Sequence, residues 1–218
     1  MKVLLTFLLL SCFIRQENDT REKLNSLENT ALPFECTRDV KHFLRSASKS
    51  IKDSIDFYFY RDIGLTMKIK ETRGEIFLLR KFEQPAFTLL AVTVNFMENG
   101  RTQWLITYDK QTRIVDTLVC GIHFDSSHDR FYLQQWRINE NREIQVSFLK
   151  MKIDPPLQHP LKMKPTQGQR VDTFYQLTDD GHFKKTREVK YKPQTYTSDY
   201  LRTVNLWNGT ETPLEPTE

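Results

Sequence analysis

The densest group of side chains that could do chemistry lies between residues 123 and 129. The sequence there is HFDSSHD, which places two imidazoles and two carboxylates within seven residues. On an extended strand His123 and Asp125 would share one face, and a tight turn could return His128 towards them, giving a two-histidine, one-carboxylate set for a transition metal. The same composition is also that of an ordinary turn, because short polar side chains bond to local backbone. A metal-assisted hydrolase centred on these residues and a plain turn are therefore both open.

Aromatic side chains indicate a second kind of chemistry, which is binding. Trp104, Tyr132 and Trp136 could form a platform for a sugar ring or a partner protein, because indole and phenol combine apolar area with a hydrogen-bonding edge. The competing interpretation is packing, since these residues lie in strand-like runs. The chain has no G-x-S-x-G motif, no glycine-rich phosphate loop and no H-E-x-x-H motif. An enzyme is therefore the less favoured class, and we expect no cofactor.

The N-terminus carries the sharpest local signal. Lys2 supplies a positive charge, residues 3–10 are nearly all apolar, and Leu9-Leu10-Ser11-Cys12 looks like a lipobox, in which a peptidase cuts before a lipid-bearing cysteine. The apolar stretch of roughly eight residues is far shorter than the ~20 that span a bilayer as a helix. We therefore expect a signal peptide at 1–11 and a lipid anchor on Cys12. An ordinary signal peptide cut elsewhere, or an apolar start to a cytoplasmic protein, are the alternatives.

With Cys12 lipidated, Cys36 and Cys120 are the two remaining thiols, and one bridge between them is the sole intramolecular pairing. Against a disulfide, Cys36 precedes a predicted helix and Cys120 lies in an apolar strand, where buried free cysteines are common. The sequence leaves both states open.

The elements that must position these groups divide the chain into four parts. Residues 12–32 are polar and predict a flexible tether, and residues 33–191 predict a single β-rich domain. Within it, apolar residues at spacings of three and four from Val40 to Ile55 predict a helix that begins at Thr37 and ends before Gly64, and residues 57–60 (FYFY) could instead start an early strand. Residues 192–218 are polar and predict a frayed C-terminal tail.

Short runs of β-branched and aromatic residues, separated by turn residues, predict an antiparallel meander. Asn99-Gly100 is the strongest hairpin signal among them. The expected strands are residues 65–71, 75–82, 87–97, 102–108, 112–122, 131–138, 142–151, 170–177 and 182–191. The fold class is therefore mainly β, a meander sheet or sandwich of eight to nine strands with one N-terminal helix, close to the α+β border.

The net charge is +4, and this near balance of basic and acidic residues does not indicate nucleic acid as a partner.

Two segments, residues 108–121 (YDKQTRIVDTLVCG) and 175–183 (YQLTDDGHF), resemble segments of small Bacteroidetes lipoproteins of unknown function. The resemblance implies a β-rich shape and a cell-envelope location, and it provides no catalytic residues to transfer.

Together these features predict a protein held by lipid in the cell envelope, at the outer or inner membrane facing the periplasm, or at the cell surface. Its expected role is to bind a protein or a glycan. A structural envelope protein or an immunity-type inhibitor is a further alternative.

Overall fold

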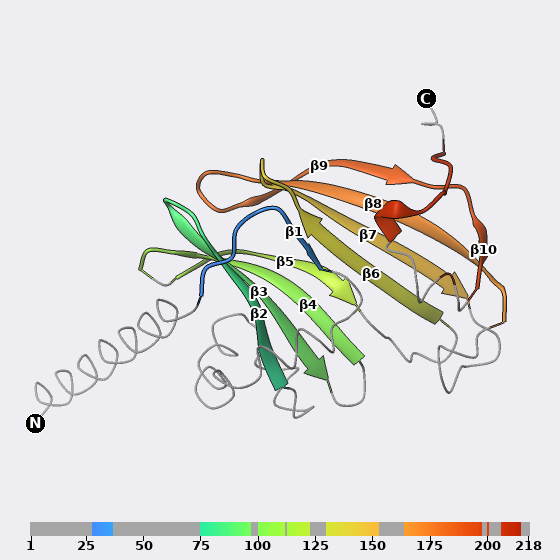
Figure 1. Cartoon of the computed structure of the whole chain (residues 1–218), viewed down its shortest axis with the longest axis horizontal. Coiled ribbons are helices and arrows are strands. Elements are labelled where there is room, and N and C mark those ends of the chain that lie inside the picture. The colour runs from blue at the N-terminus through green and yellow to red at the C-terminus, as the bar shows by residue number, and fades with distance from the viewer. Residues whose placement is uncertain are drawn as a thin grey trace, which may run out of the picture.

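The computed structural model describes residues 28–36, 75–96, 100–111, 113–122, 130–152, 164–197, 200 and 206–214. These residues are mainly β and form two antiparallel sheets, of four and six strands, which confirms the predicted class (Figure 1). The expected helix from Thr37 and the expected strand at 65–71 lie outside the described residues.

The four-stranded sheet is a meander in chain order. It consists of β2 (Glu75–Glu83), β3 (Phe87–Phe96), β4 (Gly100–Asp109) and β5 (Ile114–Ile122). The predicted hairpin between β3 and β4 is confirmed by its register, since Phe96 pairs with Gly100 and the ladder continues to Phe87 and Asp109; Asn99 itself lies outside the described residues. The strand boundaries thus lie within a few residues of those expected from alternation and turn chemistry.

The six-stranded sheet is built on a second meander. It contains β6 (Arg130–Ile138), β7 (Glu143–Lys152), β8 (Thr166–Leu177) and β9 (Phe183–Lys190). Two three-residue strands complete it: β1 (Phe34–Cys36) pairs with β6, and β10 (Gln194–Tyr196) pairs with the start of β8. The turn before β9 requires Gly181, whose φ of 92° is a conformation that side chains with a Cβ rarely adopt.

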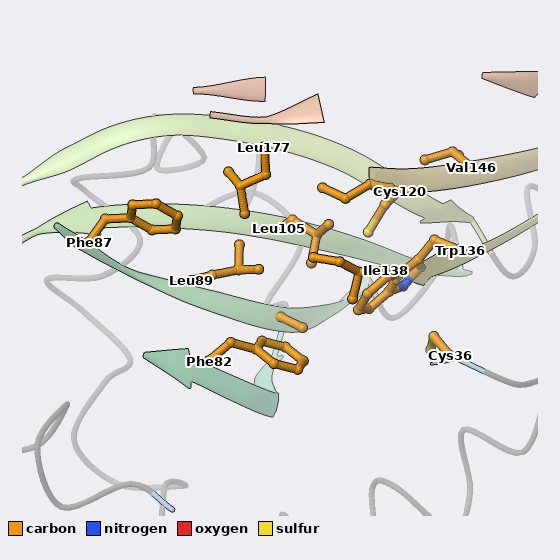
Figure 2. Packing of buried hydrophobic residues seen from close by; sticks show 12 residues of the cluster. Cys36, Phe82, Phe87, Leu89, Leu105, Cys120, Trp136, Ile138, Val146 and Leu177 are labelled. Carbon is orange, nitrogen blue, oxygen red and sulfur yellow. The ribbon is translucent and has the colours of Figure 1, made fainter. Parts of the chain in front are cut away.

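One hydrophobic core is shared by both sheets (Figure 2). Phe82, Phe87 and Leu89 enter it from the four-stranded sheet, and Trp136 and Leu177 enter it from the six-stranded sheet. Their burial brings the two sheets together, because apolar area removed from water is the main favourable term in folding. The remaining buried members are Cys36, Ala91, Leu105, Cys120, Ile138, Ile144 and Val146.

Strand β3 is buried on both of its faces over part of its length. Leu89 and Ala91 point into the shared core, whereas Leu90 and Val92, on the opposite face, are each only 1% exposed. Residues 89–92 are therefore covered on both faces of the sheet. Alternation in the sequence cannot reveal the second covered face, because Leu-Leu-Ala-Val is apolar throughout.

Both ends of the predicted domain need correction. Asn29, placed by prediction in the tether, forms a parallel bridge with Lys81, and Leu32 packs against the core. In the predicted tail, β10 joins the sheet and a 3₁₀ turn, η2 (Leu206–Asn208), buries Leu206 completely. Residues 29–32 and parts of the described stretches 192–197 and 206–214 therefore contact the domain.

None of the helices in the described part of the chain has the length and apolar character needed to cross a bilayer.

Candidate functional site

Several predicted site residues fall outside the described part of the chain. These are the lipidation site Cys12 and the metal candidates His123, Asp125 and His128. Within the described residues there is no group of three or more histidine, cysteine, aspartate or glutamate side chains that could hold a metal ion. The metal hypothesis thus stays a prediction about residues 123–129.

Trp136 belongs to the interior and not to a surface platform. Its side chain is fully buried, and its Nε1–H donates to Gln103 Oε1 over 2.9 Å. Gln103 lies on β4 of the other sheet, so this bond joins the two sheets through a polar contact inside the core. The packing interpretation therefore holds for Trp136, because a ligand at the surface cannot reach it.

Cys36 and Cys120 are both buried free thiols and do not form a disulfide with each other. Cys36 Sγ–H donates to Gln103 Oε1 over 3.3 Å, and Cys120 Sγ–H donates to the Gln103 carbonyl over 3.5 Å. Figure 2 shows Cys36 and Cys120 projecting from different strands with the Trp136 ring drawn between them. Burial raises the pKa of the Cys36 thiol to about 11 and that of Cys120 well above its ordinary value. Both thiols are thus protonated and unreactive near neutral pH.

Trp104 is the aromatic candidate that retains some exposure. It is half-buried on β4 beside Val119 of β5, a side chain that is 36% exposed. The Trp104 Nε1 atom is buried and has no hydrogen-bond partner among the described residues. Tyr132 lies on β6, in the stretch whose side chains are not described.

Asp116 links the two sheets at the opposite end of β5 from Cys120. Its Oδ2 accepts a hydrogen bond from the backbone N–H of Phe183 over 2.9 Å and lies 3.7 Å from Nδ1 of His182. Close by, the Thr107 hydroxyl donates to the Gly181 carbonyl over 2.7 Å. Asp116 therefore attaches the β8–β9 turn to the four-stranded sheet.

A buried ionic network, which the sequence did not predict, lies on the face of the six-stranded sheet that points away from the core. Arg170 and Asp172, two residues apart on β8, share this face, and their side chains are 3% and 0% exposed. Asp172 accepts bonds from Arg170 Nε over 2.8 Å and from Arg170 Nη2 over 2.6 Å. Gln145 Nε2 and the Tyr191 hydroxyl also donate to Asp172, over 2.7 and 3.0 Å.

Glu211 closes this network from the C-terminal segment. Arg170 Nη1 lies 3.0 Å from Glu211 Oε2 and also donates to the Leu206 carbonyl. Glu211 Oε1 accepts from the hydroxyls of Tyr196 and Tyr200, over 3.1 and 3.2 Å. Burial and the negative charge of Glu211 raise the pKa of both tyrosines, so they stay protonated as donors. The network thus attaches the C-terminal segment to the sheet.

Strand β9 is exposed over most of its length. Five consecutive residues, 184–188, are exposed, and the strand carries Lys184, Lys185, Arg187 and Lys190 against a single acidic residue, Glu188. Its neighbour on one side is β8, and it forms an edge of the six-stranded sheet, along the top of Figure 1. An edge strand presents backbone N–H and C=O groups that can pair with another chain.

The edge of β9 is closed at its two ends and irregular in the middle. Asp116 accepts from the N–H of Phe183 at one end, and Leu214 N–H donates to the Lys190 carbonyl over 2.8 Å at the other. The register with β8 shifts between Phe174 and Tyr175, which marks a bulge. Only a short stretch of backbone between the two closed ends is therefore left for pairing.

Comparison with known proteins does not assign the chain to a family: no family model, curated protein or solved structure matches it.

Proposed function

We propose that the chain is a lipid-anchored cell-envelope protein that binds another protein by adding a strand of that partner to the edge of β9. The observation that carries this proposal is the exposed β9 edge, with which β8 alone pairs among the described strands. Strand addition is a common mode of peptide recognition, in which main-chain hydrogen bonds supply affinity and side chains supply selectivity. The proposal commits to a protein partner in place of a glycan.

The location rests on the sequence of the leader. A charged Lys2, an apolar stretch and Leu9-Leu10-Ser11-Cys12 support lipid attachment at Cys12, with the membrane as the anchoring surface. Several acyl chains on one cysteine would hold the protein stably, whereas one chain alone would bind reversibly. The anchor would place the domain at the outer or inner membrane facing the periplasm, or at the cell surface.

Metabolic labelling with palmitate tests the anchor. We expect the full chain to incorporate label and to lack residues 1–11, and we expect a Cys12→Ala variant to lose the label. A Cys12→Ser variant is a closer isosteric control and should behave in the same way. Unchanged labelling of either variant, or a mature protein that begins at Met1, would show that Cys12 is not the anchor.

Site-specific photo-crosslinking in intact cells tests the interaction. A crosslinker replacing Lys184, which is exposed on β9, should give a discrete protein adduct. A crosslinker replacing Lys150, which is exposed on β7, is the matched control and should not give that adduct. Identical adducts from the two positions, or none from Lys184, would overturn binding at this edge.

A further inference from the structure

We infer that the partner segment that adds to β9 is acidic, extended and short, and that it occupies the backbone between Phe183 and Lys190. This inference rests on the proposed function, and it specifies the chemistry of the partner. Three features of the structure support it: the outward backbone groups of β9, the charge of its side chains, and the pairing already made at one end of the same edge.

The outward groups follow from the hydrogen bonds around β9. The N–H of Tyr191 donates to the Arg170 carbonyl, so the backbone polar groups of residue 191 face β8. Those of Lys190 therefore face away from β8, and the bond from Leu214 N–H to the Lys190 carbonyl shows the same. Two residues earlier, Glu188 points outward as well, because strand residues alternate. At the other end Phe183 points outward to Asp116, which makes Lys185 outward too. The N–H and C=O groups of Lys185 and Glu188 are therefore available to a partner strand.

The charge of the edge favours a negatively charged segment. Lys185 Nζ lies 2.6 Å from Glu188 Oε2, and Lys190 Nζ lies 4.0 Å from Glu188 Oε1, so two ammonium groups share one carboxylate. The Arg187 guanidinium lies over the Phe174 ring, and its Nη2 atom is 3.8 Å from Glu143 Oε1. Lys184 has no ion pair with any residue in the described part of the chain. The edge thus keeps an excess of positive charge that acidic side chains would complement.

The protein's own C-terminal segment shows that this edge accepts an extended chain. Tyr191 and Pro213 form an antiparallel bridge, flanked by the bond from Leu214 N–H to the Lys190 carbonyl and by the bond from Lys192 N–H to the Thr212 carbonyl. The sequence around that segment, TETPLEPTE, is acidic. A continuation of the same register would bring Pro216 opposite Glu188, and proline has no N–H to donate. The chain's own segment is therefore poorly suited to occupy the middle of β9.

The closed ends and the bulge limit what can bind. Lysines and bulges on edge strands oppose open-ended addition of further copies of the chain. Here Asp116 and Leu214 close the ends, so a partner strand cannot slide along the edge. A short acidic segment satisfies the free backbone groups of Lys185 and Glu188 and places its carboxylates near Lys184 and Lys185.

Peptide binding to the purified full chain in detergent tests the inference. The probes are a fluorescent extended peptide of repeated Glu-Glu-Val, which presents glutamates on both faces of a strand, the same peptide with lysine in place of glutamate, and an N-methylated form of the acidic peptide that cannot pair. We expect the acidic peptide to bind at least about tenfold more tightly than either of the others, and to weaken as salt is raised. The double variant Lys184→Glu, Lys185→Glu should weaken binding about tenfold, whereas Lys150→Glu should leave it unchanged.

The outcomes separate the inference from the proposed function. Equal binding of the acidic and lysine peptides, with loss on N-methylation, would overturn the acidic specificity and leave strand addition intact. No binding of any peptide, or no effect of N-methylation, would overturn both. Binding to vesicles of anionic lipid in preference to the peptide would overturn the protein partner. Dimerisation of the chain that is lost in the double variant would overturn the acidic partner segment by identifying a second copy of the chain as the occupant of β9.

Discussion

Replacing Glu211 with alanine tests how firmly the C-terminal segment is attached to the domain. The change removes the acceptor of Arg170 Nη1 at 3.0 Å and the shared acceptor of the Tyr196 and Tyr200 hydroxyls at 3.1 and 3.2 Å. The Glu211 side chain is 0% exposed, so water does not replace the lost carboxylate without local opening. Donors left unpaired in a buried site cost the full penalty of their desolvation.

The magnitude follows from two opposing effects. Hydrogen bonds to a charged group contribute about 1.5–3 kcal/mol each, and removing one member of a buried ion pair typically costs about 3–5 kcal/mol. Two effects reduce this loss of stability. Asp172 still neutralises Arg170 through two hydrogen bonds, and the variant no longer buries two carboxylates beside one guanidinium. We therefore expect Glu211→Ala to lower the free energy of unfolding by about 3 kcal/mol, at the low end of the range for buried pairs.

Urea unfolding followed by circular dichroism measures this change. The urea midpoint should fall with little change in slope, and the melting temperature should fall by roughly 6–12 °C for a domain of this size. Glu211→Gln, which keeps an acceptor for the tyrosines, should lie between the wild type and the alanine variant. Glu188→Ala removes an exposed ion pair with Lys185 and should leave the midpoint nearly unchanged. A Glu211→Ala midpoint equal to that of Glu188→Ala would refute the account of the network.

Three further predictions concern the shared core. Trp136→Phe removes the donor to Gln103 and should cost about 1–3 kcal/mol in urea unfolding; an unchanged midpoint would show that the bond between the sheets is not needed. Gly121→Ala would place a Cβ against Gln103 Oε1 and 2.8 Å from Gln103 Cβ, and should lower the free energy of unfolding by about 1–3 kcal/mol in the same assay. An unchanged free energy of unfolding would contradict tight packing at this position. The pKa of Cys36 rises on folding from 9.0 to about 11 because burial disfavours the thiolate. The contribution of the protonated thiol to the free energy of unfolding, about 3 kcal/mol, is therefore complete below pH 9 and is lost as the pH rises through 11. Cys36→Ser should therefore lose less stability than the wild type between pH 9 and 11, and identical pH profiles would contradict this.

Local sequence signals predicted the strands well because each strand is bounded by turn residues with their own chemistry. The Asn99-Gly100 signal lies in sequence between the paired strands β3 and β4, and Asp180-Gly181 lies between β8 and β9. In the Asn139–Arg142 turn, the Glu143 N–H donates to the Asn139 side-chain oxygen. Strands β1 and β10 were missed because three residues are too few for a periodic pattern. Their pairing depends on β6 and β8, which are distant in sequence.

The buried ionic network was only partly visible in the sequence. Opposite charges at Arg170 and Asp172 are two apart on a predicted strand, and that spacing indicates a shared face and a possible ion pair. Glu211 is different, because it lies in an acidic, proline-containing stretch that resembles a free tail. Its burial follows from contacts with Tyr196 and Tyr200, and neither tyrosine forms a pattern with it. Likewise, Trp136 could be assigned to the interior only once Gln103 was found opposite it.

The attachment of Glu211 to Arg170 also sets an order of events during synthesis. Arg170 and Asp172 leave the ribosome first, and Glu211 follows 41 residues after Arg170. At about 5–20 residues per second that interval is roughly 2–8 s. During it the guanidinium has Asp172 as a partner but lacks the carboxylate that fixes the C-terminal segment. If the chain is exported as proposed, the face of the six-stranded sheet stays open to water, or to a chaperone, until residue 211 has crossed the membrane.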